Sequence, residues 1–310
     1  GLLNSAVNIL DMFTEKGQLL VYTEGKTYKS KRKYLSKSEP LVPNEIKITV
    51  LVNQGSASAS EIVAGVLQDV DRGVVIGRST FGKGLVQTVI NIDRERSVKI
   101  TSAKYFIPSG RLIQKPGYLP KELLADTSSI DSVFFTKGGR SVSGLGGINP
   151  DYKVDLNNIE PLLSVSLRKG LFFSFVQKNK SKYNSFEDVE SDTSILNDFE
   201  MYMYSNDIQA KMKGESNYIK MKEKLLELDS NSVQIQGALD ILDSYFEDIS
   251  INQFDREKKD IYHWLLVEFA EYFNGVEGRF KISARKDLDI QKAMNILHDP
   301  VVFDNIFLPQ

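Results

Sequence analysis

The spacing of apolar residues changes near Asp155, and this change constrains the fold more than any other feature of the sequence. Before it, short β-rich runs such as residues 73–77 alternate with segments of helical period such as residues 57–70. Such alternation is typical of an α/β core. After it, the segments have helical period almost throughout. We therefore predict an α/β domain over residues 1–155 and a mostly helical region over residues 156–310.

Composition excludes several classes of protein. The chain has 310 residues, of which 41% are hydrophobic and 26% charged, as in ordinary globular domains. Cysteine is absent, which excludes disulfides, thiolate metal sites and cysteine nucleophiles. No apolar run approaches the ~20 residues that cross a bilayer, so we expect no transmembrane segment. The 39 Lys and Arg residues against 41 Asp and Glu residues give a net charge of −2, so we expect no nucleic-acid partner.

One local basic segment departs from this balance. Six basic residues occur between Lys26 and Lys37, and the segment lies between two predicted strands, residues 17–25 and 45–53. We predict that it is a solvated loop.

Three serines precede the helical segment that starts near Ala57, in the stretch NQGSASASE. They are Ser56, Ser58 and Ser60. A serine hydroxyl is a poor nucleophile unless an adjacent base removes its proton, and that base is usually histidine. The two histidines, His263 and His298, both lie in the predicted helical region, and we predict structural roles for them.

Ser58 and Glu61 also match a capping box, in which the two side chains satisfy free backbone N–H groups at a helix start. Capping alone would explain both residues. The same position suits catalysis, because a helix N-terminus offers unpaired N–H donors and a partial positive charge to a developing oxyanion. The chemistry of the residues therefore leaves the choice open among the three serines and between capping and catalysis.

Lys83 is the candidate base in the α/β half, which has no histidine. Burial disfavours a charged ammonium group, and a neutral amine is a competent base. Gly82 and Gly84 flank the lysine and permit close approach of the backbone. Gln87 follows by four residues, a spacing that puts two side chains on one face of a strand or a helix, so its amide oxygen could hold the amine. A surface lysine on a loop explains the spacing equally well.

Four segments then occur in a recognisable order: VLVNQGSASASEIVAGVLQD, VVIGRSTFGKGLVQ, ITSAKYFIPSGRLIQ and GGINPD. In order and spacing they resemble the core of the bacterial carboxyl-terminal processing proteases, also called tail-specific proteases, which are serine endopeptidases with a Ser–Lys dyad. The likeness spans roughly residues 1–155, and the pair SASASE and FGKGxVQ is its most specific part.

The resemblance implies a role for individual residues. Ser58 matches the nucleophile, Lys83 the general base and Gln87 the residue that positions the base. The family's oxyanion hole uses the backbone N–H of the residue after the nucleophile, here Ala59, and a glycine from an upstream turn, for which Gly1 is the match. No metal and no cofactor is implied.

The resemblance also implies features of the whole protein. We expect a Clp-protease/crotonase-like α/β core, cleavage of proteins with exposed C-terminal tails, and a periplasmic or cell-envelope location. The family usually carries a PDZ domain and a first core strand upstream, and neither is expected within these 310 residues. Helical C-terminal regions in the family sometimes form homodimers.

Two other functions stay open on the sequence. One is a catalytically inactive fragment or relative that acts as a peptide-binding or scaffold module. The other is a crotonase-type acyl-CoA enzyme, which shares the fold but not the Ser–Lys pair. The presence of Ser58, Lys83 and Gln87 favours the protease, because a binding role needs none of the three.

Overall fold

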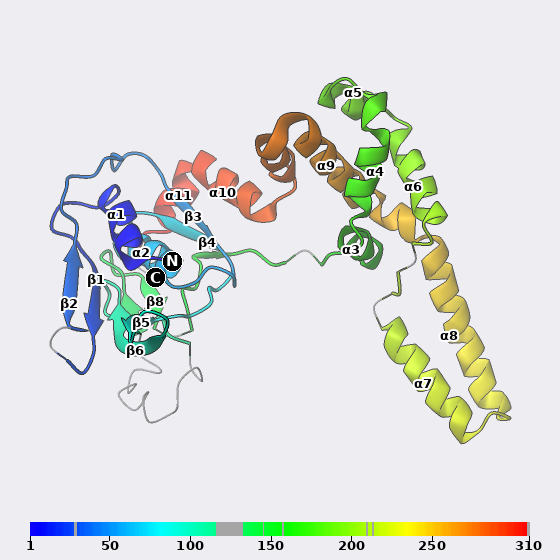
Figure 1. The fold of residues 1–310 in the computed structure, drawn as a ribbon, viewed down its shortest axis with the longest axis horizontal. Coiled ribbons are helices and arrows are strands. Elements are labelled where there is room, and N and C mark those ends of the chain that lie inside the picture. Colours follow the sequence, from blue (N-terminus) through cyan, green and yellow to red (C-terminus); the bar gives the residue numbers. More distant parts are fainter. Residues whose placement is uncertain are drawn as a thin grey trace. The chain divides into compact units, whose positions relative to one another are not determined.

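The chain folds into two compact units, which are considered separately (Figure 1). The computed structural model describes residues 1–27, 30–115, 133–144, 146–156, 158–208, 210–212 and 214–308. Unit 1 comprises Gly1–Asp155 and Leu288–Gln310, and unit 2 comprises Leu156–Asp287. The α/β class with a helical C-terminal region is confirmed.

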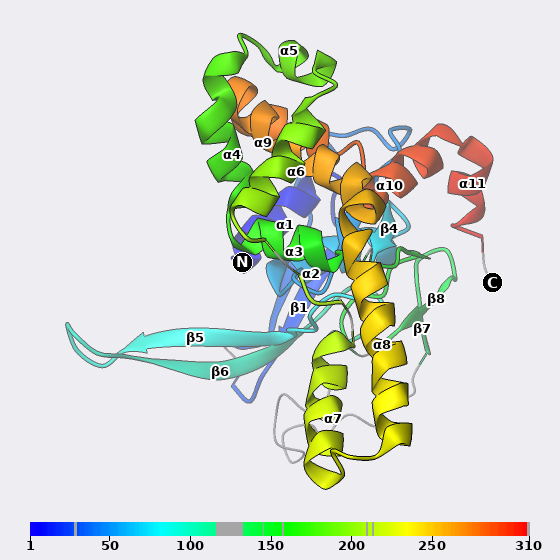
Figure 2. The same ribbon diagram turned by 90° about the vertical axis from the view of Figure 1, so that its right-hand side faces the viewer.

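Unit 1 combines antiparallel and parallel sheets. Its elements are α1 (Leu3–Asp11), β1 (Leu19–Glu24), β2 (Arg32–Leu35), β3 (Thr49–Val52), α2 (Ala59–Asp69), β4 (Val74–Gly77), β5 (Leu85–Asn91), β6 (Ser97–Phe106), β7 (Val133–Phe135), β8 (Ser141–Ser143), β9 (Tyr152–Lys153), α10 (Leu288–His298) and α11 (Pro300–Asn305). An antiparallel sheet has the order β2-β1-β6-β5, a parallel sheet has the order β3-β4-β9, and β7 pairs with β8. Figure 2 shows β5 and β6 as a long two-stranded ribbon.

The main core of unit 1 lies where α1 and α2 pack against β1, β4 and β6. Apolar residues at helical spacing in α2, such as Ile62 and Val66, face Val75 of β4 and Ile107 just after β6. All of β4 is buried, because helices cover both faces of this strand. The run VVIG therefore shows no polar alternation in the sequence.

The C-terminal end of α2 is held by buried arginines. Arg111 pairs with Asp69 at 2.7 Å, and their side chains are 1% and 0% exposed. Burial raises the pKa of Asp69 and lowers that of Arg111, while the charge of each partner opposes the shift of the other. Arg140 pairs with Asp71 and Asp151, each at 2.7 Å. These pairs fix α2 against the segments around Arg111 and β8.

The C-terminal end of the chain differs from the prediction that the helical region extends to residue 310. Helices α10 and α11 belong to unit 1, where Ala293, Ile296 and Phe303 pack against Val74 and Ile76. Without α10 and α11, the face of β4 opposite α2 would expose Val74 and Ile76 to water. An ion pair of 2.7 Å between Arg78 and Asp289 adds to this packing.

The prediction of a solvated loop between Lys26 and Lys37 is wrong in part. Residues Arg32–Leu35 form β2, an edge strand that pairs antiparallel with β1. Because an edge strand with charged side chains protects itself from further pairing, it lacks the apolar alternation that identifies strands.

Unit 2 is helical in its described residues. Its elements are α3 (Pro161–Arg168), α4 (Leu171–Asn179), the short 3₁₀ turn Lys180–Lys182, α5 (Phe186–Ser191), α6 (Ile195–Ser205), α7 (Glu215–Leu228), α8 (Val233–Ile251) and α9 (Gln253–Ser283). Aromatic residues form the core, with Phe199 stacked on Phe172 and edge-on to Phe175. Within the part of the chain that the structure describes, no helix is long and apolar enough to cross a membrane.

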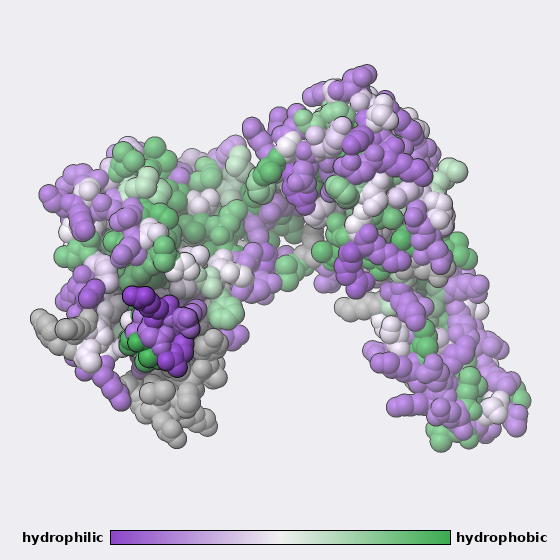
Figure 3. Space-filling view, viewed as in Figure 1, coloured by the Kyte–Doolittle hydropathy of each residue, from purple (hydrophilic) through white to green (hydrophobic). Residues whose placement is uncertain are grey.

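The hairpin of α7 and α8 is the most exposed part of unit 2. Tyr218 donates a hydrogen bond to Asp243 at 2.7 Å, and Lys222 pairs with the same carboxylate at 2.5 Å. Its surface is mostly polar with a few apolar residues (Figure 3), and Leu228 and Val233 near its turn are each 82% exposed.

We predict that Ile296→Ala destabilises unit 1 by about 2–5 kcal/mol, because it leaves a cavity between α10 and β4. Ile296 is 1% exposed, whereas Met294 on the same helix is 45% exposed, so Met294→Ala should change stability by less than about 0.5 kcal/mol. Hydrogen exchange of the β4 amides measures both effects. Equal protection in the two variants would contradict the assignment of α10 to unit 1.

Candidate active site

Ser58 lies directly before the first residue of α2, as the sequence predicts, and its backbone is strained. Its φ of 60° and ψ of −117° fall in a region that normally requires glycine. A non-glycine residue held there costs about 1–3 kcal/mol and persists only when its surroundings hold it in place. The strained turn presents the serine at the N-terminus of the helix, the arrangement also found in nucleophile elbows.

Glu61, on the first turn of α2, joins this turn to the loop that carries Lys83. Its side chain is fully buried. One carboxylate oxygen, Oε2, accepts the backbone N–H of Ser58 at 2.7 Å and that of Lys83 at 2.9 Å. The two amide nitrogens are therefore no farther apart than the sum of these distances. Glu61 thus brings the candidate nucleophile and the candidate base into one site.

The other oxygen of the Glu61 carboxylate, Oε1, binds the start of the same loop. It accepts the Thr80 hydroxyl at 2.6 Å and the Gly82 N–H at 2.6 Å. The Thr80 hydroxyl in turn accepts the Ile148 N–H at 2.7 Å, which ties the loop to the GGINPD segment. Four donors therefore surround one buried carboxylate, which offsets the cost of removing its charge from water.

The glycines beside Lys83 have the role predicted for them. Gly82 has a φ of +85°, and a Cβ atom there would lie 2.8 Å from the side chain of Lys115. A Cβ atom at Gly84 would lie 2.8 Å from the backbone nitrogen of Gln114. The loop can pass this close to its neighbours only because both residues are glycine. The Lys83 side chain between them is half-buried.

Ala59 and Gly1 lie side by side next to Ser58. A Cβ atom added to Gly1 would lie 2.8 Å from the Cβ of Ala59. The Ala59 N–H has no acceptor among the described residues, as expected for the first N–H groups of a helix. Both residues named by the resemblance for the oxyanion hole therefore lie at the same place, while their role in binding an oxyanion stays a prediction.

The other two serines occupy different environments. The Ser56 hydroxyl accepts the Asn53 N–H at 3.2 Å, and the Ser56 carbonyl accepts the Phe81 N–H at 2.9 Å, so Ser56 shapes the turn. Ser60 is exposed on α2. Of the three serines, Ser58 is the one whose N–H shares an acceptor with that of Lys83.

Gln87 is exposed on β5, and no hydrogen bond joins its side chain to Lys83 in the described residues. Lys83 precedes the strand, and the pairing register shifts between Val86 and Gln87. The argument from a spacing of four residues assumed uninterrupted alternation, which this bulge breaks. The positioning role of Gln87 stays a prediction that rests on the resemblance.

Neither histidine is joined to Ser58 by a hydrogen bond in the described residues. His263 belongs to unit 2 and contacts Trp264 edge-on, and burial lowers its pKa, as do the nearby charges of Lys286 and Arg285. His298 ends α10. Their structural roles stay predictions.

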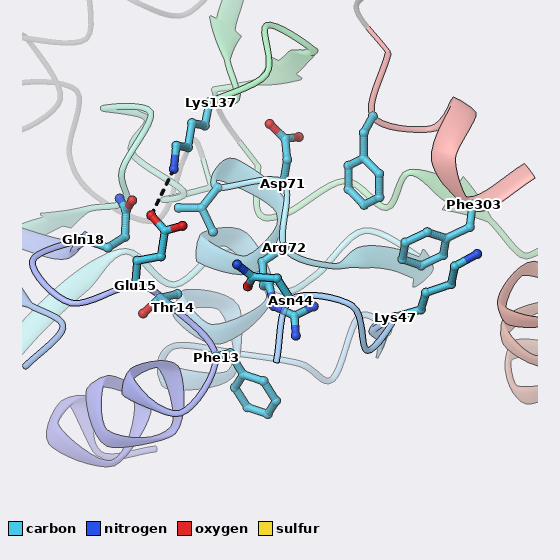
Figure 4. Close-up of a pocket in the computed structure, with 12 residues that line it drawn as sticks. Phe13, Thr14, Glu15, Gln18, Asn44, Lys47, Asp71, Arg72, Lys137 and Phe303 are labelled. Carbon is cyan, nitrogen blue, oxygen red and sulfur yellow. Dashed lines mark ion pairs between the residues drawn. The ribbon is translucent and has the colours of Figure 1, made fainter. Parts of the chain in front are cut away.

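A cavity of about 230 Å³ lies elsewhere on unit 1 (Figure 4). Its walls carry charges of both signs, and an ion pair of 3.6 Å joins Lys137 and Glu15. Neither Ser58 nor Lys83 lines it, so it is not part of the candidate site. Within the described residues, no group of three His, Asp or Glu side chains could hold a metal ion.

The sequence did not reveal three features of the site. They are the bridging role of Glu61, the contribution of Thr80 and the contribution of Tyr105 on β6. Glu61 was recognised only as a capping residue, because its other donors come from a loop about twenty positions later. Tyr105 shares the buried face of its strand with Ala103, and Ile107 just after the strand is buried as well. A tyrosine on such a face needs a partner for its hydroxyl, and this was the available signal.

A serine on a strained turn at a helix N-terminus in an α/β core is an arrangement also found in serine hydrolases. Residues 1–123 match the model of peptidase family S41, and residues 162–297 match the model described as probable PDZ-protease, C-terminal helical domain. The chain therefore contains a peptidase family S41 domain followed by a helical domain of this kind.

Individual proteins similar to this chain are named carboxy-terminal processing proteases. The carboxy-terminal-processing protease of Bartonella bacilliformis is 44% identical over 120 residues, which cover 39% of this chain and 27% of that protein. The carboxy-terminal processing protease CtpA of Bacillus subtilis is 31% identical over 225 residues, which cover 67% of this chain and 46% of that protein. Among solved structures, the photosystem II D1 C-terminal processing protease is 30% identical, with a TM-score of 0.36, over 50% of this chain and 32% of that chain. The chain thus spans less than half the length of these relatives.

We predict that Glu61→Gln destabilises unit 1 by at least about 2 kcal/mol, because the amide nitrogen would face two donors that then lack an acceptor. Labelling of Ser58 by a serine-reactive probe should also slow. Chemical denaturation and the labelling rate measure the two effects. The matched control is Glu95→Gln in the exposed β5–β6 turn, which should be nearly neutral. A Glu61→Gln variant that behaves like this control would contradict the bridging role.

The strained backbone at residue 58 gives a second prediction. Ser58→Gly should be more stable than Ser58→Ala by about 1–3 kcal/mol, because both lack the hydroxyl and only glycine adopts this conformation without strain. Thermal denaturation of the two variants is the measurement. An alanine variant as stable as the glycine variant would show that the turn is not strained.

Proposed function

We propose that this chain is the catalytic core and helical region of a serine endopeptidase that cleaves proteins at or near their C-terminal tails through a Ser–Lys dyad. The observation that carries the proposal is the shared Glu61 acceptor, which holds the backbones of Ser58 and Lys83 together at the N-terminus of α2. The protease names of the relatives support it, and they do not favour a catalytically inactive scaffold.

In the proposed mechanism, the neutral amine of Lys83 takes the proton of the Ser58 hydroxyl as Oγ attacks the scissile carbonyl carbon. The tetrahedral intermediate collapses when Lys83 returns that proton to the leaving amine and the C–N bond breaks. Water then attacks the acyl-enzyme while Lys83 accepts its proton. Lys83 returns this proton to Ser58 Oγ as the acyl C–O bond breaks, which releases the product acid, free Ser58 and the neutral amine.

The oxyanion is assigned to the Ala59 N–H at the start of α2 and to a glycine N–H, for which Gly1 is the candidate. Donors held before the reaction begins need no reorganisation as charge develops, and loss of one such donor typically slows catalysis about 100- to 1,000-fold. The partial positive charge of the helix N-terminus acts in the same direction.

Substrates, location and assembly belong to the same proposal. Substrates with exposed C-terminal tails and a periplasmic or cell-envelope location are supported by the family. Homodimerisation through the helical region is supported by the exposed apolar residues of the α7–α8 hairpin, among them Leu228, Val233 and Ile241.

The test uses an unfolded reporter protein with a short apolar C-terminal tail. Ser58→Ala and Lys83→Arg should each abolish cleavage, the first because the nucleophile is lost and the second because a guanidinium stays protonated. Ser56→Ala and Ser60→Ala should retain measurable turnover. Cleavage by the Lys83→Arg variant would refute the lysine base, and loss of activity in Ser60→Ala equal to that in Ser58→Ala would refute the choice of serine.

A further inference from the structure

Tyr105 is a buried tyrosine whose hydroxyl lies at the candidate site. It belongs to β6, is 3% exposed, and pairs across the sheet with Thr23 of β1. Its backbone N–H donates to the Gly84 carbonyl at 3.0 Å, which joins the end of the lysine loop to β6. Tyr105 thus belongs to the same buried core as the α2 residues Ala59 and Ile62.

The hydroxyl of Tyr105 donates a hydrogen bond to the backbone carbonyl of Lys83. This bond uses the one proton of the phenol. The backbone N–H of Lys83 shares the acceptor Glu61 Oε2 with the backbone N–H of Ser58. The Tyr105 hydroxyl therefore holds the backbone of the candidate base through its carbonyl, at the point where Glu61 joins this base to the candidate nucleophile.

The protonation state of Tyr105 suits a fixed donor. Burial raises the pKa of the phenol, and the negative charge of Glu61 raises it further, while the Ser58 side chain opposes this shift. The phenol stays protonated while the dyad works, so it neither takes the proton of Ser58 nor competes with Lys83 as a base.

We propose that Tyr105 is a positioning residue of the dyad, in which the phenol holds the Lys83 backbone in place relative to Ser58. Glu61 binds the N–H groups of both residues, and Tyr105 binds the carbonyl of Lys83. This inference rests on the proposed function, because it assigns Tyr105 a place in that reaction.

The test compares the 310-residue chain with Tyr105→Phe and Tyr22→Phe. Tyr22 is a matched control, because it lies on the adjacent strand β1, stacks on Phe106 with ring centroids 5.0 Å apart, and has no hydrogen bond to Ser58 or Lys83 in the part of the chain that the structure describes. The readouts are the rate of Ser58 labelling by a fluorophosphonate probe over a range of pH, kcat and KM on the tailed reporter, and thermal stability.

Tyr105→Phe should lower the labelling rate and kcat by about 10- to 100-fold, because a small misplacement of the reacting atoms is costly. KM should stay near that of the unchanged chain, and the labelling rate should fall by the same factor at every pH, since the base is still Lys83. Tyr22→Phe should leave all readouts unchanged.

Labelling of Tyr105→Phe at the full rate would overturn the inference and leave the proposed function intact. A loss of labelling that follows a loss of thermal stability, or a change in the shape of the pH profile, would also overturn it, the first in favour of a structural role and the second in favour of proton transfer. If the unchanged chain and its Ser58→Ala variant are labelled alike, the proposed function itself fails, and the inference falls with it.

Discussion

The buried carboxylate of Glu61 is the interaction on which the candidate site depends. An isolated carboxylate in this position would be strongly unfavourable, and it is stabilised only because four donors point at it. Two of these donors are the N–H groups of Ser58 and Lys83. Part of the buried charge of Glu61 is therefore compensated by the two residues that the proposed reaction needs close together.

Other features of unit 1 follow from this arrangement. The strained backbone of Ser58 is held because its N–H is bound to Glu61 while its carbonyl already belongs to α2. The lysine loop reaches the carboxylate because Gly82 and Gly84 let it pass close to Lys115 and Gln114. The opposite end of α2 is fixed by Arg111 and Arg140, so the helix that presents the serine is anchored at both ends.

The sequence predicts what depends on local periodicity and misses what depends on distant partners. The runs that became α2 and β4 were identified because α2 carries one apolar stripe and β4 is apolar throughout. Strand β2 was missed because its charged edge lacks that pattern, and α10 was assigned to the helical region because an amphipathic helix does not reveal which surface its apolar face covers. At the site, Ser58 and Lys83 were found from their motifs, whereas the contacts of Thr80 with Glu61 and of Tyr105 with Lys83 depend on the tertiary fold.

The bridging role of Glu61 can be tested most directly by residue-resolved amide hydrogen exchange of Ser58, Gly82 and Lys83, measured by NMR. If one buried carboxylate binds all three N–H groups, these amides should exchange only when unit 1 unfolds, with the same free energy as the amides of β4. Exchange of the three amides at rates typical of an exposed loop would show that the carboxylate does not hold the serine turn and the lysine loop together.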